Sequence, residues 1–340
     1  MARPAPGPAL AALALALVWA GGAGAQSNPG TTTGVFLRIE PSARVAAQGG
    51  AGATARQSAL DAYYNPGALG FLSATDAAFS HSAWLADIDY DYAAVAVKLG
   101  AANTVSLSVT SLRSGDIDVR TPEQPQGTGE RFSADDFAIG VGYGRRFTDR
   151  FGAGAQVKYV QQSIWRSTSR TAAFDAGVIY ELPFRAVLGA SVSNFGVKTA
   201  FGGNDLRVRY DQDPDVFGDN DNLPAALETG EFALPIYFRV GLSAPFEVGA
   251  DSRVTVSADA FQYNDNSNSL SVGGEWTYAG LVSARAGYQD LFLEDGEGGL
   301  RLGGGLRYRV NGLDLRFDYA WGDHGSRLGD TQRFTLGLGF

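Results

Sequence analysis

Residues that could carry out catalysis or bind a metal are scarce in this sequence of 340 residues. It has no cysteine, and its only histidines, His81 and His324, lie far apart in the chain. Zinc sites and nucleophile–base pairs need several such side chains in combination. No Gly-x-x-x-x-Gly-Lys-Ser/Thr stretch is present to cradle a phosphate. We therefore expect a protein that is not an enzyme and uses no cofactor.

One acidic segment has the spacing of the first half of a calcium loop, because Asp211, Asp213 and Asp215 alternate with other residues. However, Val216 stands where the sharp turn of such a loop needs glycine, and Asn222 where a bidentate Glu belongs. The three aspartates are thus only a weak metal candidate. We prefer a solvated acidic loop and predict no metal site.

Charge and composition narrow the possible partners. The formal net charge is −9, which makes nucleic acid an improbable ligand, and glycine accounts for 45 residues, well above its usual share of about 7%. Such a surface suits divalent cations or basic partners. With no cysteine, disulfides cannot stabilise the fold.

The N-terminus has the pattern of a secretory signal peptide over residues 1–25. Arg3 precedes an apolar run at 10–20, and Ala23-Gly24-Ala25 forms a small-residue cleavage site. The apolar run is shorter than the ~20 residues that span a bilayer, although a retained anchor is the alternative. We expect cleavage near Ala25, followed by a polar tail at 26–34.

Residues 35–74 differ from the rest of the chain, because they are rich in small residues and do not alternate. Gly49 and Gly50 allow a sharp turn, and a short helix is expected to end at Asn65-Pro66. We interpret this segment as a plug (a hatch) inside the mouth of a barrel. A soluble N-terminal arm is the alternative.

Residues 75–340 alternate between apolar and polar side chains with a period of two, which predicts β-strands. Leu313, Leu315 and Phe317 fall on one face, whereas Arg316 and Asp318 fall on the other. About 14 strands are expected, an even number, as bacterial single-chain barrels have. The predicted strands lie near 75–83, 87–99, 102–113, 132–147, 150–164, 168–181, 186–196, 234–246, 252–264, 268–278, 281–290, 299–310, 313–321 and 332–340.

The last strand has an apolar face formed by Phe334, Leu336, Leu338 and Phe340. A barrel in lipid must pair its last strand with its first, because unpaired backbone groups there cost several kcal/mol each. The ending is similar to the C-terminal signal that barrel-assembly machinery recognises, whereas a soluble sandwich strand is the alternative. Tryptophans near strand ends, Trp84 among them, are interpreted as a girdle at the membrane surface.

The gaps between strands alternate in length. Numbered along the chain, the even gaps are short, such as Asn311-Gly312, while the odd ones include 114–131 and 197–233. Outer-membrane barrels have short periplasmic turns and long outer loops, and a sandwich has no reason to sort its loops in this way. The fold class predicted is therefore an all-β, transmembrane, antiparallel β-barrel with an N-terminal plug in the outer membrane.

Several stretches resemble the PorV/PorQ family, which is related to the long-chain fatty-acid transporter FadL. They are FLRIEPSARVAAQGG at 36–50, YYNPGALG at 63–70, FSHSAWLADIDYDYAAVAVKLG at 79–100, TGERFSADDFAIGVGYGRRFTDRFGAGAQVKYV at 128–160, NFG at 194–196 and RAGYQD at 285–290. The plug motif comprises Gly49, Gly50 and Tyr64-Asn65-Pro66-Gly67, where Gly67 replaces the alanine that the family usually has. We expect this glycine to loosen the turn.

The resemblance implies a 14-stranded outer-membrane barrel associated with type IX secretion. Its partners would be the C-terminal domains of secreted cargo, attachment machinery and other secretion components, besides membrane lipid and the barrel-assembly machinery. The alternative is passive uptake of hydrophobic small molecules, as the FadL relationship implies. Inward positions here are mostly Gly, Ser, Thr, Asp, Arg and Lys, and this favours secretion over an apolar uptake channel.

Overall fold

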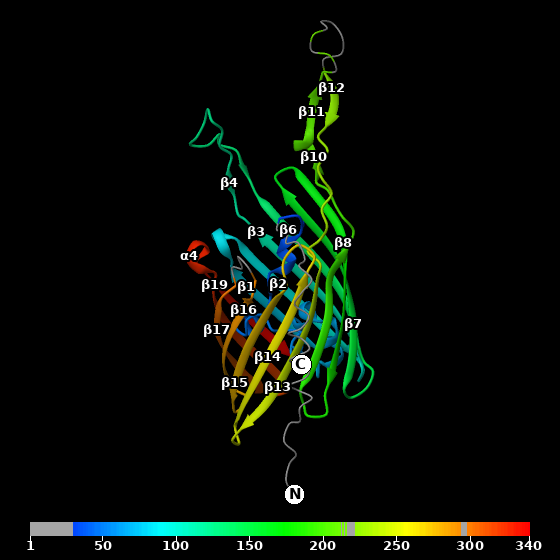
Figure 1. Ribbon diagram of the computed structural model, residues 1–340, viewed down its shortest axis with the longest axis vertical. Helices are drawn as coiled ribbons and strands as arrows, with labels where there is room; N and C mark the ends of the chain where they lie inside the picture. The colour runs from blue at the N-terminus through cyan, green and yellow to red at the C-terminus, as the bar shows by residue number, and fades with distance from the viewer. Residues whose placement is uncertain (1–29, 212, 214, 216–221, 294–297) are drawn as a thin grey trace.

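A computed structural model describes residues 30–211, 213, 215, 222–293 and 298–340. Fourteen long antiparallel strands form one closed wall (Figure 1). They are β1 (Asp76–Ala83), β2 (Asp89–Leu99), β3 (Asn103–Arg113), β6 (Ala134–Arg146), β7 (Phe151–Ile164), β8 (Ser167–Glu181), β9 (Val187–Gly196), β13 (Tyr237–Val248), β14 (Ser252–Tyr263), β15 (Ser269–Tyr278), β16 (Val282–Leu291), β17 (Leu300–Val310), β18 (Leu313–Asp323) and β19 (Asp330–Gly339). The predicted barrel is confirmed, and each predicted strand overlaps one of these.

The wall closes where the last strand meets the first. β19 pairs with β18 on one side and with β1 on the other, in a register that runs from Asp76 opposite Gly339 to Ala83 opposite Gln332. The amide of Phe340 donates a further hydrogen bond to the carbonyl of Thr75, at 2.9 Å. Backbone groups at this seam are therefore paired, as a lipid environment requires.

The two faces of the wall differ in chemistry, because successive side chains of a strand point to opposite sides. On β18, Leu313, Leu315 and Phe317 point outward and are exposed, while Asp318 is buried inside. On β6, Ile139, Val141 and Tyr143 are exposed, and the glycines between them face inward. A wall with an apolar outside and a polar inside fits a bilayer.

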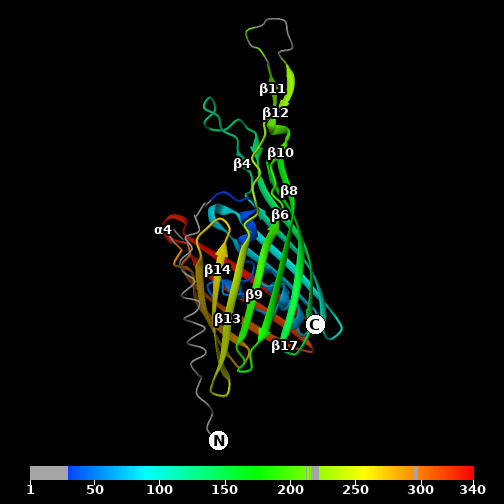
Figure 2. The same cartoon turned by 45° about the vertical axis from the view of Figure 1, so that its right-hand side comes forward.

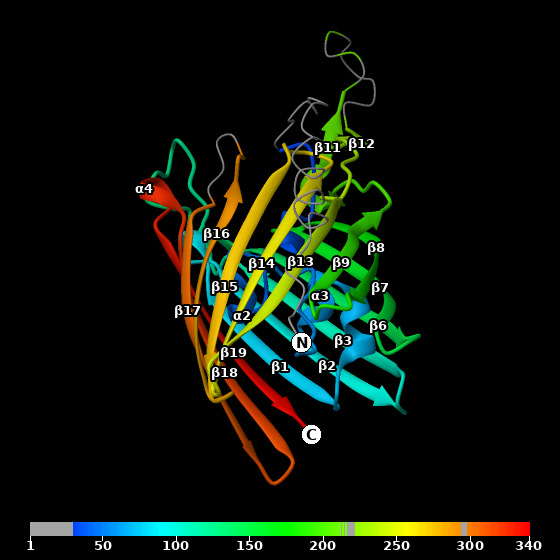
Figure 3. The same ribbon diagram turned by 60° about the horizontal axis from the view of Figure 1, so that its bottom comes forward.

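Residues 35–72 lie inside the barrel (Figure 3). They form four short helices, η1 (Val35–Arg38), α2 (Ala43–Ala46), α3 (Asp61–Tyr64) and η2 (Pro66–Phe71), which we call the plug. Ser42 begins α2, where its side chain accepts a hydrogen bond from the amide of Val45. Leu60 and Leu69 are fully buried, so the plug forms the core of the molecule together with inward side chains of the wall.

Inward glycines let the plug approach the wall closely. A Cβ added to Gly154 would lie 2.2 Å from the carbonyl oxygen of Pro66, and one added to Gly287 would lie 2.3 Å from the backbone of Gln48. Gly303, in the Gly-Gly-Gly run of β17, packs in the same way against Ala47. The high glycine content thus has a structural cause, since side chains at these positions would push the plug away.

The loops at the two ends of the barrel differ in length, as the gap lengths predict. Two arms extend far beyond one rim (Figures 1 and 2). The first arm, residues 114–133, contains β4 (Ile117–Asp118) and β5 (Arg131–Phe132). The second arm, residues 197–236, contains β10 (Gly202–Gly203), η4 (Asn204–Leu206), β11 (Arg207–Tyr210) and β12 (Leu223–Ala226). Two further short helices, η3 (Leu85–Asp87) and α4 (Gly325–Leu328), lie in loops at the same rim, which we call the loop end.

Tight turns occupy the opposite rim, which we call the turn end. One of them is formed by Asn311 and Gly312, both with positive φ, between β17 and β18. Among the residues described, no helix is long and apolar enough to cross a membrane.

Candidate functional site: a plug between two chambers

Asn65 of the plug motif connects the plug to the wall. It is fully buried, and its Nδ2 donates hydrogen bonds to the carbonyls of Ala53 and Val178, each at 2.9 Å. Its Oδ1 accepts a hydrogen bond from the amide of Gly67, also at 2.9 Å. Val178 belongs to β8, so this single side chain holds together two parts of the plug and one wall strand.

Gly67 does not loosen this turn, contrary to our expectation from the sequence. Its amide is held by Asn65, and an added Cβ would meet the carbonyl oxygen of Gly177 at 3.0 Å and the Cα of Val178 at 3.1 Å. The residue is therefore packed tightly against β8. Pro66 contributes through its carbonyl, which lies against the inward glycines of β6 and β7.

Gly49, Gly50 and Tyr64 fix the other half of the plug. Both glycines have positive φ, 66° and 79°, and an added Cβ on Gly50 would collide with the carboxylate of Glu40. Tyr64 is fully buried, and its hydroxyl accepts a hydrogen bond from the amide of Ser42 at 3.2 Å. The structure thus places the predicted motif residues inside the barrel, with Gly49 against Tyr288 of β16 and Gly67 against Gly177 of β8.

A buried charge pair, which sequence reasoning missed, holds the middle of the plug. Asp259 on β14 accepts a hydrogen bond from the amide of Ala53 at 2.7 Å and lies 4.0 Å from the guanidinium of Arg239 on β13. That guanidinium is within 5.4 Å of three aromatic ring centroids, those of Tyr64, Tyr237 and Phe261. Nε and Nη1 of Arg239 have no hydrogen-bond partner, so cation–π contacts provide much of its stabilisation.

On the loop-end side of the plug lies a cavity of about 730 Å³, which we call the outer chamber. Aromatic and aliphatic side chains contribute much of its lining: Phe36, Trp84, Leu85, Ile88, Leu112, Tyr237, Phe261 and Tyr263. Glu40 also lines it, and burial raises the pKa of its carboxyl while the positive charges of Arg333, Arg239 and Arg301 oppose that rise. A cavity of this size and lining suits a small, mostly apolar molecule.

Trp84 does not belong to a membrane girdle. Its indole packs partly buried against the core, with the His324 ring 5.4 Å away in an edge-to-face arrangement and the Arg333 guanidinium 5.9 Å from its ring. The outer chamber was also unforeseen. Phe261 and Tyr263, two residues apart on β14, share the inward face, and this spacing is the signal that could have identified it.

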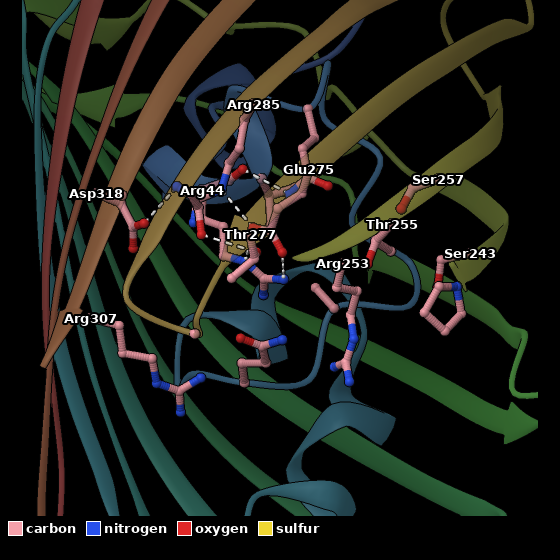
Figure 4. Close-up of a pocket in the computed structure, with 18 of the residues that line it drawn as sticks. Arg44, Ser243, Arg253, Thr255, Ser257, Glu275, Thr277, Arg285, Arg307 and Asp318 are labelled. Carbon is pink, nitrogen blue, oxygen red and sulfur yellow. Dashed lines mark hydrogen bonds and ion pairs between the residues drawn. The ribbon is translucent and has the colours of Figure 1, made fainter. Parts of the chain in front are cut away.

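On the turn-end side of the plug lies a second cavity of about 610 Å³, the inner chamber (Figure 4). Its walls are polar, with Ser243, Thr255, Ser257 and Thr277 among the lining side chains. A continuous ion-pair network crosses it from plug to wall. Arg44 of α2 pairs with Glu275 at 2.8 Å, and Arg285 bridges Glu275 and Asp318 at 2.6 Å to each.

The predicted C-terminal signal residues lie on the outside of the seam. Phe334, Leu336 and Phe340 are exposed, Leu338 is partly exposed, and Phe334 packs against the ring of Tyr319 at 5.1 Å. Leu336 and Leu338 line an apolar groove of about 590 Å³ on the outer surface, together with residues of β1, β2, β17 and β18. These side chains would contact lipid acyl chains if the barrel is in a membrane.

The weak calcium candidate lies in the second arm, distant from both chambers. Oδ1 of Asp211 accepts a hydrogen bond from the amide of Asp213, and Oδ1 of Asp213 accepts one from the amide of Asp215. These side chains therefore stabilise their own turns, while Val216 lies outside the described residues. In the part of the chain that the structure describes, no group of three or more His, Cys, Asp or Glu side chains could hold a metal ion.

Comparison with known proteins identifies the fold. No protein-family model and no curated protein matches the sequence. Three similar solved structures are the Pseudomonas putida toluene transporter TodX (TM-score 0.53, covering 86% of this chain and 95% of that one), the monoaromatic hydrocarbon channel CymD (0.55, 88% and 96%) and a Pseudomonas aeruginosa FadL homologue (0.51, 92% and 98%). Sequence identity is 13% in each case, so the likeness shows that this chain has the FadL-type barrel fold.

Proposed function

We propose that this protein is an outer-membrane barrel through which small hydrophobic molecules cross passively. The outer chamber is the observation that carries this proposal, because it offers a site of about 730 Å³ at the loop end in which aromatic and aliphatic side chains line the cavity beside charged ones such as Arg38, Asp136 and Asp290. The similar structures, which are described as hydrocarbon transporters and channels, support it. This reading replaces secretion as the first choice, since the inward face is aromatic at the loop end.

The location is part of the proposal. The exposed apolar outer face and the paired seam suit a bilayer, and a cleaved signal peptide at residues 1–25 would direct the chain to the periplasm, where barrel-assembly machinery inserts it. With the arms outside the cell and the tight turns in the periplasm, the outer chamber faces the medium.

Passage requires the plug to move. Leu60, Tyr64, Asn65 and Leu69 are fully buried between the two chambers, so a solute in the outer chamber meets packed side chains. Removing the contacts of Asn65 or Asp259 would release the plug from the wall. We infer that these two residues set how readily the chambers connect.

Uptake of a monoaromatic hydrocarbon tests this function. We would compare the wild-type barrel with the double variant I88N/L112N, which places two amides on the apolar lining, and with the control V208N, which makes the same type of change on the second arm. In cells lacking their own hydrocarbon channels, the proposal expects faster uptake with wild type and V208N than with an empty vector. With I88N/L112N, the increase in uptake rate over the empty vector should fall to half of the wild-type increase or less.

Wild-type uptake equal to the empty vector would refute the proposal. Equal uptake by wild type and I88N/L112N would remove the outer chamber from the path. Heat-dependent migration in gels checks that each variant has assembled.

A second candidate is a PorV/PorQ-type role in type IX secretion, in which the arms bind exported protein. Two features support it. The arms extend far beyond the rim (Figure 2), and the second arm exposes Val208, Tyr210, Leu227 and Phe232. Apolar side chains with charged neighbours suit a protein contact. Shortening both arms in the native host should reduce surface display of cargo under this reading and leave hydrocarbon uptake intact, whereas undiminished display would refute it.

A further inference from the structure

The inner chamber is unusual for an acidic protein, because its lining is basic. The whole chain has a formal net charge of −9, yet eight arginines and four carboxylates line this cavity. The arginines are Arg44, Arg56, Arg185, Arg253, Arg285, Arg307, Arg309 and Arg316, and the carboxylates are Glu247, Asp251, Glu275 and Asp318. The lining itself thus has four more arginines than carboxylates, and Asp76, Glu181 and Asp314, which pair with lining arginines from outside it, reduce the local excess to one positive charge.

The carboxylates that pair with several of these arginines do not line the chamber themselves. Asp314 accepts hydrogen bonds from Arg307 at 2.7 and 2.5 Å but does not line the chamber itself. Asp76 pairs with Arg316 and Glu181 pairs with Arg56 in the same way, and Asp76 and Asp314 line a neighbouring cavity of about 430 Å³. These ion pairs hold the arginines in position at the edge of the chamber.

Not all donors of these arginines are used. Nε of Arg253 donates a hydrogen bond to Oε1 of Glu247 at 3.0 Å, Nη2 lies 2.9 Å from the same oxygen as an ion pair, and the Arg253 side chain remains 57% exposed. Arg307 uses Nε and Nη2 on Asp314. Each guanidinium has five N–H groups, so Arg253 and Arg307 each have donors left for a ligand.

The surroundings strengthen the attraction for an anion. The barrel wall surrounds the chamber, and a low-dielectric wall around an excess of one sign of charge concentrates the field. Hydroxyls of Ser243, Thr255, Ser257 and Thr277 add neutral hydrogen-bonding groups (Figure 4). An apolar molecule would gain little here, because the polar groups would lose water without gaining partners.

We propose that the inner chamber is a binding site for small organic anions that carry two or more carboxylates, reached from the turn end. Carboxylates match the planar fork of a guanidinium with two parallel hydrogen bonds, and the cavity of about 610 Å³ holds a molecule of this size. The site goes beyond the proposed passage of hydrophobic molecules, whose apolar chamber lies on the other side of the plug.

Calorimetric titration of the purified barrel in a neutral detergent tests the site. Citrate is the probe, glycerol is the uncharged control, and inorganic phosphate shows whether any oxyanion suffices, all at constant ionic strength. We expect wild type to bind citrate with a Kd below about 1 mM, to ignore glycerol, and to bind citrate more weakly as salt is raised.

The double variant R253Q/R307Q removes two positively charged side chains from the lining, one on β14 and one on β17. It should bind citrate at least about tenfold more weakly. The matched control is R113Q, because Arg113 is also an exposed arginine paired with a carboxylate, Asp91 at 2.8 Å, but lies at the loop end. It should bind citrate as wild type does.

Three results would overturn the site: no citrate binding by the wild type, equal binding by R253Q/R307Q, or an equal loss in R113Q. Tighter binding of phosphate than of citrate would overturn the preference for carboxylates. If the double variant does not assemble, R309Q replaces it, since Arg309 is 66% exposed, and threefold weaker binding is then expected.

The outcome does not depend on transport. Citrate binding without hydrocarbon uptake would leave this site in place and refute the passage, while uptake without citrate binding would do the reverse.

Discussion

Replacing Asn65 by alanine should release the plug. The change removes three hydrogen bonds of 2.9 Å at a fully buried position, those to Ala53, Val178 and Gly67. Asn65→Asp is the companion variant. Its Oδ1 can still accept from the amide of Gly67, but it loses both donors and adds a buried charge.

The size of the effect follows from these contacts. A hydrogen bond between neutral groups contributes about 1 kcal/mol net, and a buried partner left unpaired costs somewhat more. Three such bonds amount to roughly 3 kcal/mol, which is about a hundredfold change in the equilibrium between a seated and a displaced plug. Asn65→Asp should have at least this effect, because the charge adds a desolvation cost.

Thiol labelling measures this equilibrium directly. The chain has no cysteine, so Ala62→Cys on α3 supplies a single probe at a site that is 4% exposed. A bulky maleimide can react there only when the plug is displaced. With Asn65 intact we expect slow labelling, and with Asn65→Ala we expect labelling about a hundredfold faster.

Asn103→Ala is the matched control. It removes one hydrogen bond of an asparagine at the turn end, from the hydroxyl of Tyr143 at 2.7 Å, without touching the plug. Labelling should then proceed at the original rate. Equal rates in the Asn65→Ala and Asn103→Ala backgrounds would refute the idea that Asn65 holds the plug.

Four further predictions follow from the wall and the seam. Gly67→Ala should lower the free energy of unfolding, measured with urea, by only about 1 kcal/mol. Gly177→Ala should lower it more, because the added Cβ would lie 2.1 Å from Oδ1 of Asn65. Asp259→Asn should lower the free energy of unfolding by about 3–5 kcal/mol, because the buried Arg239 loses the negative charge that lies 4.0 Å away. An unchanged thermal melting curve would contradict this. Deleting Phe340 should reduce the outer-membrane yield far more than removing 197–233, and equal yields would contradict a role in closure. The wild-type barrel should migrate faster in gels before boiling than after it, and identical mobilities would argue against a closed wall.

Much of the barrel could be predicted from the sequence because its signals are local. Alternation with a period of two is a property of neighbouring residues, and it marked all 14 long strands to within a few residues. Turn and loop lengths placed both arms at one end for the same reason. The environment on each side of the wall dictates which residue types face it, and this leaves a readable pattern along the chain.

The functional site was harder to predict, because its contacts join residues far apart in sequence. The plug motif was noticed, but nothing local shows that Asn65 reaches Val178 or that Asp259 holds Ala53. Trp84 looked like a girdle residue because its position near a strand end gives no information on the direction of its side chain. Gly67 looked permissive because the wall that packs against it is more than a hundred residues away.

By itself, the sequence determined a closed, even-stranded barrel with an N-terminal segment of different character, since those features depend on periodicity and loop length. Only the tertiary structure decided that the plug divides the lumen into an aromatic chamber and an arginine-lined one. Inward residues of many strands contribute to each chamber, and their side chains meet only when the sheet closes into a cylinder. Which inward residues share a chamber depends on the tilt and register of the strands, and no single segment of the chain records these.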